Sequence, residues 1–189
     1  MSHVDTASFE ERFRRDPDPW DFATSFYEIR RYAVIVAALP RFRFRHAFEP
    51  ACANGDLTRR LADRCDAVTA LDCSATAVAR ARARCAGRPG VTIRLGELPG
   101  DWPCERFDLV VLSELGYYFD RAELADLRER AVASLPVGGH LIAVHWLGTS
   151  EDHLLSGDDV HRVLHAGVRL TPIAAYRDVR FRLDLWERG

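Results

Sequence analysis

The stretch that most constrains the fold is a run of small residues directly after an apolar segment. Phe48 belongs to that segment, and Ala51, Ala53 and Gly55 follow at every second position. Phosphate or amino-acid groups approach a backbone only where side chains are minimal, and a helix starting just after Gly55 would direct free N–H groups at an anionic ligand. Asp72 comes seventeen residues after Gly55, where a carboxylate ending the next strand would meet ribose hydroxyls. The pattern predicts a nucleotide-type cofactor site.

Strand and helix patterns alternate through the rest of the chain. We expect strands at His46–Glu49, Val68–Asp72, Val91–Leu95, Phe107–Ser113, His140–Trp146, Thr171–Arg177 and Arg180–Trp186. Helices are expected at 56–64, 74–85 and 120–135 and from Asp158 to about Ala166. Such alternation is typical of an α/β fold with a doubly wound, Rossmann-like sheet. We predict seven strands, mostly parallel, with an antiparallel C-terminal strand.

The N-terminal forty residues are expected to form a helical lid. Residues 8–15 resemble a short charged helix, and the prolines within residues 16–19 interrupt it. Ser25 and Glu28 have the spacing of a capping box for a second helix that runs up to Pro40. At 189 residues and 48% hydrophobic composition, the chain suits one domain. We therefore predict a lid over 1–40 and a core over 41–189.

Three further residues are expected to cap helices. Ser74 lies where it can cap the helix expected at 74–85. Asp120 and Glu123 have the capping-box spacing for the helix expected at 120–135.

The charge balance argues against nucleic acid as a partner. The net charge is −2 and the isoelectric point about 6.4, whereas phosphate binding usually requires a basic patch. The one dense basic run, Arg41, Arg43 and Arg45, is interpreted as a solvated loop, with contact to an anionic substrate as the alternative. Every basic residue is arginine, which excludes Schiff-base and P-loop lysine chemistry.

The five cysteines form no C-x-x-C pair and are odd in number. This pattern indicates neither a disulfide framework nor a zinc site. No apolar run reaches the length of a membrane span, and the N-terminus lacks the features of a signal peptide. We expect a cytoplasmic protein with no membrane partner and a small-molecule substrate, and the sequence leaves its oligomeric state open.

Ligands of such sheets bind beyond the carboxyl ends of the strands. The residues expected there are Glu49–Gly55, Asp72, Cys73, Gly96, Glu97, Leu98, Ser113, Glu114, Leu115, His145 and Trp146. Asp72 is interpreted as a ribose ligand, and its alternative is a cap for the following helix, which Ser74 could serve instead. Glu97 could bind an adenine amino group, or the neighbouring backbone could do so while Glu97 faces water.

Glu49-x-Ala51-x-Ala53-x-Gly55 resembles the E/D-x-G-x-G-x-G first motif of class I S-adenosylmethionine-dependent methyltransferases, with alanine at the first two glycine positions. Alanine is penalised wherever the backbone requires a positive φ. Asp18–Trp20, Phe26–Tyr32 and Ser113–Tyr118 are similar to segments of the rhizobial nodulation N-methyltransferases, and the resemblance covers roughly residues 16–146. It implies S-adenosylmethionine as cofactor, S-adenosylhomocysteine as product, and an amine acceptor such as an amino sugar.

The resemblance also assigns candidate roles to residues. The cofactor contacts it implies are Arg31, Glu49, Ala51, Cys52, Ala53, Gly55, Asp72, Cys73, Gly96, Glu97, Leu98, Ser113 and Glu114. Arg31 could clamp the cofactor carboxylate, or it could face solvent beside Glu28. Methyl transfer depends mainly on alignment, with a base for a protonated amine. Glu114 and His145 are the candidate bases, with a helix-capping glutamate and a satisfied strand-end histidine as the alternatives.

Six aromatic residues could surround the substrate or belong to the core: Trp20, Tyr27, Tyr32, Tyr117, Tyr118 and Trp146. Residues 148–161 form an acidic segment that contains His153 and His161. We interpret its charges as solvated or as complementing a helix dipole, with metal binding as the alternative, and we predict no metal.

Two other functions remain open from the sequence. One is O-methylation of a natural-product acceptor. The other is a degenerate Rossmann-like binding protein that lost turnover when Ala51 and Ala53 replaced glycine.

Overall fold

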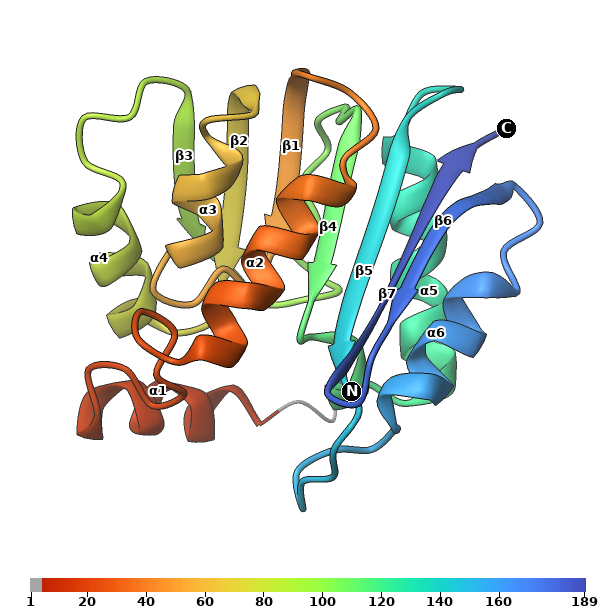
Figure 1. The fold of residues 1–189 in the computed structure, drawn as a ribbon. Helices are drawn as coiled ribbons and strands as arrows, with labels where there is room; N and C mark the ends of the chain where they lie inside the picture. The colour runs from red at the N-terminus through yellow and green to blue at the C-terminus, as the bar shows by residue number, and fades with distance from the viewer. Residues whose placement is uncertain (1–4) are drawn as a thin grey trace. The chain divides into compact units, whose positions relative to one another are not determined.

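The computed structural model describes residues 5–189, which divide into two compact units, 5–97 and 98–189 (Figure 1). Each unit contains strands covered by helices. The organisation as one domain with a lid over 1–40 stays a prediction. Across the described residues, every helix is too short or too polar to cross a membrane.

The first unit contains a three-stranded parallel sheet. Its elements are α1 (Thr6–Arg15), α2 (Phe26–Ala38), β1 (Phe44–Pro50), α3 (Asp56–Leu61), β2 (Cys65–Asp72), α4 (Ala75–Arg84) and β3 (Val91–Leu95). The strand order is β3-β2-β1, and Glu49 of β1 lies opposite Ala70 of β2. β1 and β2 both end in buried residues. Helices and loops typically cover parallel strands on both faces.

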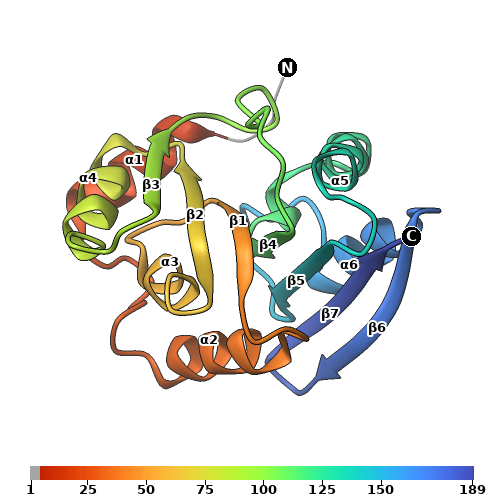
Figure 2. The same ribbon diagram turned by 90° about the horizontal axis from the view of Figure 1, so that it is seen from above.

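The second unit contains β4 (Leu109–Ser113), the 3₁₀ helix η1 (Gly116–Tyr118), α5 (Arg121–Ser134), β5 (His140–Trp146), α6 (Gly157–His165), β6 (Leu170–Arg177) and β7 (Phe181–Arg188). β4 and β5 are parallel, and β7 runs antiparallel to both β5 and β6. Figure 2 shows α5 and α6 on the same face of these strands. The α/β class and the seven-stranded, mostly parallel sheet are therefore confirmed.

Two of the predicted helix caps are confirmed. Ser74 accepts a hydrogen bond from the Ala77 N–H at the start of α4. Asp120 and Glu123 form the complete capping box of α5. The Asp120 side chain accepts the Glu123 N–H, and the Glu123 side chain accepts the Asp120 N–H.

The predicted capping box of α2 is wrong. Ser25 precedes the helix but its side chain accepts no capping hydrogen bond. Its N–H donates to the Asp21 carbonyl, and the Glu28 side chain pairs with Arg31. The helix expected from Asp158 begins one residue earlier, at Gly157. Ser156 is its cap and accepts the Asp159 N–H at 3.1 Å.

The helix predicted over 56–64 is shorter than expected. α3 ends at Leu61, after which Asp63 and Arg64 donate to carbonyls three residues back. This tighter turn lets the chain enter β2 at Cys65.

Candidate functional site

The loop after β1 has an unusual backbone. Ala51 has φ 56°, Ala53 φ 47° and Gly55 φ 80°, so every second residue adopts the left-handed conformation. Gly55 also approaches α4 closely, because a Cβ on it would lie 3.0 Å from Ala81. Glycine suits such positions, whereas alanine adopts them at a cost. All three small residues of the motif thus lie in the left-handed region, and two of these positions carry the less suitable residue.

Asp72 at the end of β2 holds this loop in place. Its Oδ2 accepts the Ala53 N–H at 2.8 Å, and its Oδ1 accepts the Ser74 N–H at 2.9 Å. The carboxylate is 5% exposed, and burial raises its pKa, although the hydrogen bonds oppose that rise. A backbone hydrogen bond from Cys73 also lowers the pKa of Asp72, so three N–H groups use part of an acceptor capacity of about four lone pairs. Asp72 thus organises the loop and retains limited acceptor capacity for a diol hydroxyl.

Glu49 is a buried acid at the end of β1. Its side chain is 2% exposed, and Oε2 has no hydrogen-bond partner. Burial, reinforced by the nearby charge of Asp72, raises its pKa to about 8, while the Thr58 hydroxyl and, to a smaller extent, the charge of Arg31 act in the opposite direction. A buried carboxyl oxygen without a partner is costly in isolation. The group therefore fits a ligand that brings an ammonium or another donor to this strand end.

Arg31 of α2 is also buried, at 2% exposure. It forms an ion pair with Glu28, and its guanidinium lies 4.8 Å from the centre of the Tyr32 ring and 5.7 Å from that of Tyr27. The expected pairing with Glu28 is present, but the alternative of a solvent-facing arginine is wrong. Tyr32 is buried, and Tyr27 is partly exposed.

Glu10 of α1 binds the start of α4, which follows Asp72 closely in the sequence. It accepts hydrogen bonds from the Ser74 hydroxyl at 2.6 Å and from the Thr76 hydroxyl at 2.7 Å and N–H at 3.1 Å. These bonds, led by the one from Ser74, lower the pKa of Glu10 to about 2. Figure 1 shows α1 beyond the carboxyl ends of β2 and β3. Helix α1 is therefore tied to the strand end that carries Asp72.

The Asp-Pro-Trp segment after α1 contacts the small-residue loop. Asn54 donates to the Pro17 carbonyl at 2.9 Å, and Asp18 accepts the Phe22 N–H at 2.9 Å. Trp20 packs with Phe13 at 5.5 Å between ring centres. Trp20 is thus partly engaged in holding α1.

The ends of β2 and β3 contain the other expected cofactor residues. Gly96 donates its N–H to the Asp72 carbonyl at 3.0 Å, and Glu97 is exposed. Burial raises the pKa of Cys73 to about 12, so it stays a thiol at neutral pH. Leu98 is buried, and so is Cys52 in the loop after β1.

In the second unit, β4 leads into a strained acidic residue. Glu114 follows Ser113 with φ 56° and donates its N–H to the Val144 carbonyl at 2.9 Å. The Tyr117 hydroxyl donates to Glu114 Oε2. A non-glycine residue in the left-handed region at a strand end often marks a functional position. The side chain is partly exposed, so Glu114 remains the accessible candidate base.

His145 is fully buried, and both of its ring nitrogens have hydrogen bonds. Nε2 accepts the Gly116 N–H at 3.0 Å, and Nδ1 lies 3.1 Å from Nε2 of His161. A base must offer an open lone pair to its substrate, and neither nitrogen does so here. The alternative of a satisfied strand-end histidine describes this geometry better.

Aromatic rings gather around Tyr117. His153 stacks on Tyr117 with ring centres 3.8 Å apart, and Tyr118 and Trp146 meet His153 edge-on at 5.3 Å and 6.2 Å. Burial lowers the pKa of His153, which favours the neutral ring. Tyr118 and Trp146 are partly exposed, whereas Tyr117 is buried.

Comparison with known proteins identifies the family. A family model for "Nodulation protein S (NodS)" matches residues 6–144. The chain belongs to the NodS family. A nodulation protein S from Rhizobium tropici is 30% identical over 127 residues, which are 66% of this chain and 53% of that protein. The chain thus spans about half the length of this curated NodS relative.

Solved structures agree with this assignment. A protein from Pseudomonas syringae, provisionally named a methyltransferase, is 41% identical with a TM-score of 0.78 and covers 87% of this chain and 100% of its own. The N-methyltransferase NodS from Bradyrhizobium japonicum WM9, solved with S-adenosylhomocysteine, has a TM-score of 0.85 at 22% identity, covering 97% of this chain and 98% of its own. The NodS comparison at 22% identity supports the Rossmann-like methyltransferase fold.

Sequence reasoning about this NodS family member missed three residues of the second unit. Asp184 was not singled out, and His153 and His161 were interpreted only as parts of an acidic segment. His161 contacts His145 from a different element, and Asp184 contacts His161 from a third. No local spacing rule relates residues so far apart in the chain.

The acidic segment serves structural contacts. Asp158 pairs with Arg177 and Arg182, and Asp159 pairs with Arg121 and Arg162. Within 5–189, no group of three or more His, Cys, Asp or Glu side chains could hold a metal ion. The carboxylates of Asp158 and Asp159 are thus paired with arginines.

Proposed function

We propose that this NodS family member is an S-adenosylmethionine-dependent methyltransferase that methylates an amine of a small polar acceptor, such as an amino sugar. The observation that carries the proposal is the strand-end arrangement of Glu49, the left-handed loop and Asp72. The family match and the N-methyltransferase named among the similar structures support the choice of donor and of reaction.

The residues of the first unit suit this donor. The unpartnered Oε2 of Glu49 offers an acceptor to the ammonium of the methionine group, and a positive charge there would favour the ionised carboxylate. Asp72 would accept the ribose hydroxyls through its remaining lone pairs. Bound at this site, the sulfonium supplies an electrophilic methyl group for in-line displacement.

In the second unit we assign the proton acceptor to Glu114. An amine must lose its proton before it attacks, and a positioned carboxylate can accept that proton. The Tyr117 hydroxyl orients Glu114 through Oε2, and the left-handed backbone at Glu114 sets the direction of the side chain. We assign His145 a supporting part, because both ring nitrogens are engaged.

Each unit offers partly exposed aromatic side chains as candidates for contact with the acceptor. Trp20 and Tyr27 of the first unit and Tyr118 and Trp146 of the second retain exposed surface, and aromatic faces attract both sugar rings and cationic methyl groups. The buried Tyr32 and Tyr117 support Arg31 and Glu114 instead. A cytoplasmic location belongs to the same proposal, since all five cysteines are free.

Calorimetric titration with S-adenosylmethionine and S-adenosylhomocysteine tests the donor. We expect both to bind, and Asp72→Ala to weaken binding by at least tenfold, since two hydrogen bonds are worth about 1–3 kcal/mol. Asp63→Asn, an exposed carboxylate of the same unit, is the matched control. Undetectable binding of both compounds would reject the proposal.

A panel of radiolabelled methyl-transfer assays then tests the acceptor. Partially deacetylated chitooligosaccharides, simple amines and phenolic natural products represent the alternatives. We expect transfer to the free amine of the amino sugar and a rate that falls by about 10²-fold or more in Glu114→Gln. Transfer to phenols alone would replace N-methylation by O-methylation.

A further inference from the structure

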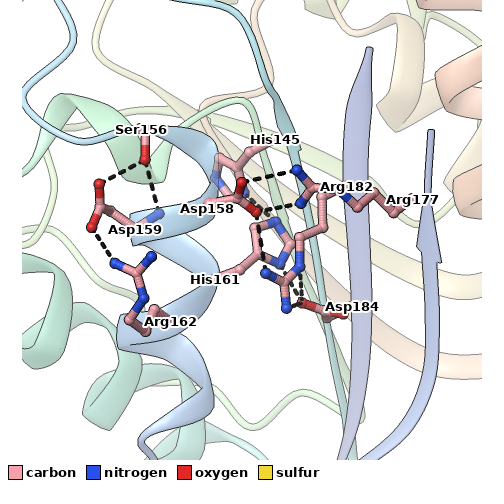
Figure 3. Close-up of polar contacts among 9 residues, drawn as sticks. All are labelled: His145, Ser156, Asp158, Asp159, His161, Arg162, Arg177, Arg182 and Asp184. Atoms are coloured by element: carbon pink, nitrogen blue, oxygen red, sulfur yellow. Dashed lines mark hydrogen bonds and ion pairs between the residues drawn. The ribbon is translucent and has the colours of Figure 1, made fainter. Parts of the chain in front are cut away.

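A row of buried hydrogen bonds connects three elements of the second unit. His145 of β5, His161 of α6 and Asp184 of β7 lie in sequence along it (Figure 3). The two ring nitrogens that face each other are 3.1 Å apart, and His161 Nδ1 is 2.7 Å from Asp184 Oδ2. All three side chains are buried. We call this row, together with the Gly116 N–H, the imidazole chain.

The direction of every bond in the imidazole chain follows from its first member. A backbone N–H only donates, so His145 Nε2 must accept from Gly116 and carries no proton. The proton of the neutral ring therefore lies on Nδ1 and is donated to His161 Nε2. His161 must then carry its own proton on Nδ1 and donate it to Asp184. The carboxylate at the far end accepts only, so both ends impose the same direction.

The charges around the chain favour this state. Burial lowers the pKa of His161 despite its bond to Asp184, which keeps the ring neutral. Asp184 remains ionised, because contacts with His161 and Arg182 outweigh its burial and lower its pKa. Arg182 donates to Asp184 Oδ2 at 2.8 Å and pairs in turn with Asp158 (Figure 3). The carboxylate is thus held by a second, partly exposed set of ion pairs.

The near end of the chain holds the loop that carries Glu114. Gly116 begins η1, and Tyr117 in that turn donates to Glu114. A Cβ on Gly116 would lie 2.4 Å from Val160 Cγ1 and 3.1 Å from His145 Nε2. Only the residue without a side chain permits this approach. The position of η1 is therefore determined by α6 and by the ring of His145 together.

We propose that His161 and Asp184 are positioning residues for methyl transfer, because through His145 they hold the Gly116 amide and with it the loop that presents Glu114. The catalytic part of this inference rests on the proposed function. Neither residue touches the substrate in this proposal. They keep His145 in the tautomer protonated on Nδ1, and this tautomer lets Nε2 accept the Gly116 N–H and hold the loop in position.

Nuclear magnetic resonance of the full chain with ¹⁵N-labelled histidine tests the tautomers directly. We expect His145 and His161 both as neutral rings protonated on Nδ1 at pH 7.5. An Nε2-protonated ring or an imidazolium at either position would overturn the proposal. This measurement needs no acceptor, so it remains decisive even if methyl transfer were never observed.

Two substitutions separate positioning from folding. His161→Gln keeps an amide oxygen that can accept from His145, whereas His161→Leu has no acceptor. We expect hydrogen exchange at the Gly116 amide to accelerate roughly tenfold in the leucine variant and much less in the glutamine variant. His165→Leu, at the exposed end of the same helix, is the control and should leave exchange unchanged.

Once an acceptor is known, the effects on kcat should follow the same order as the effects on hydrogen exchange, with the leucine variant more affected than the glutamine variant. His161→Leu should lower kcat about tenfold while the Kd for S-adenosylmethionine stays within twofold, and His161→Gln should recover most of the rate. If leucine and glutamine give equal rates and equal exchange, the proposal is wrong. If His161→Leu does not fold, the wild-type tautomers and the His161→Gln variant still decide it. Absent cofactor binding in the wild type would instead refute the proposed function.

Discussion

Replacing Ala51 and Ala53 by glycine should stabilise the protein, against the usual effect of such a change. Both residues have positive φ, at 56° and 47°. An L-residue in the left-handed region costs about 1–2 kcal/mol relative to the right-handed one. Glycine removes that cost but increases the conformational entropy of the unfolded chain, which opposes the gain by about 0.4–1 kcal/mol.

The half-buried methyl groups reduce the gain a little further. A buried methyl contributes about 0.8 kcal/mol, and both alanines are partly exposed, so about half of this is lost at each site. The net increase in the free energy of unfolding is then about 0.5 kcal/mol per site. For both sites together we expect about 1 kcal/mol, or a rise in Tm of about 2–4 °C for a chain of this size.

Chemical denaturation of the two single variants and the double variant measures this effect. Ala86→Gly is the matched control, because Ala86 is an exposed turn residue outside the left-handed region. It should lose about 0.5–1 kcal/mol through the same unfolded-state entropy. If Ala51→Gly and Ala53→Gly lose stability as Ala86→Gly does, the alanines carry no backbone strain and the reasoning fails.

Three further predictions concern groups buried in the two units. Folded Glu49 keeps its proton up to about pH 8, whereas the unfolded chain releases it near 4.5, so stability falls as pH rises between these values, by about 3 kcal/mol at pH 7. Glu49→Gln should remove that loss and raise the free energy of unfolding by about 1–3 kcal/mol, yet weaken S-adenosylmethionine in calorimetry; a less stable variant would contradict the buried neutral acid. Burial lowers the pKa of His161, so the unfolded state takes up a proton first and stability is lost as pH falls through about 6.5, the ordinary histidine value; urea titrations from pH 7.5 to 5.5 should show a smaller loss in His161→Gln, and an identical loss would refute the assignment. Gly116→Ala should cost about 1–3 kcal/mol through overlap with Val160, and Val160→Ala should be less harmful in that background than in the wild type, whereas additive losses would exclude the contact.

Many elements of both units could be predicted from local patterns. The alternation of apolar runs and helical spacing predicted the seven strands, since each rule involves residues a few positions apart. The spacing of Ala51, Ala53 and Gly55 marked a loop of small residues, and the structure shows that all three have positive φ. Asp120 and Glu123 revealed a helix start because both capping bonds lie within one turn.

The same local rules failed where a side chain had a choice of partners. Ser25 and Glu28 have the spacing of a capping box, but Glu28 is buried with Arg31. An Arg31 paired with Glu28 was expected to face solvent. Its burial depends on the contact with Tyr32 and on how α2 packs. A sequence pattern defines which partners are near along a helix, and packing decides which face turns inward.

The sequence by itself determined the order of the elements, the small-residue loop and the carboxylates that end β1 and β2. Only the tertiary structure decided that Glu49 is buried without a partner and that His145 is occupied by His161 and Gly116. The physical reason is range. Backbone propensities and capping act over a few residues, whereas burial and the choice of hydrogen-bond partner depend on atoms brought together from α6, β5 and β7.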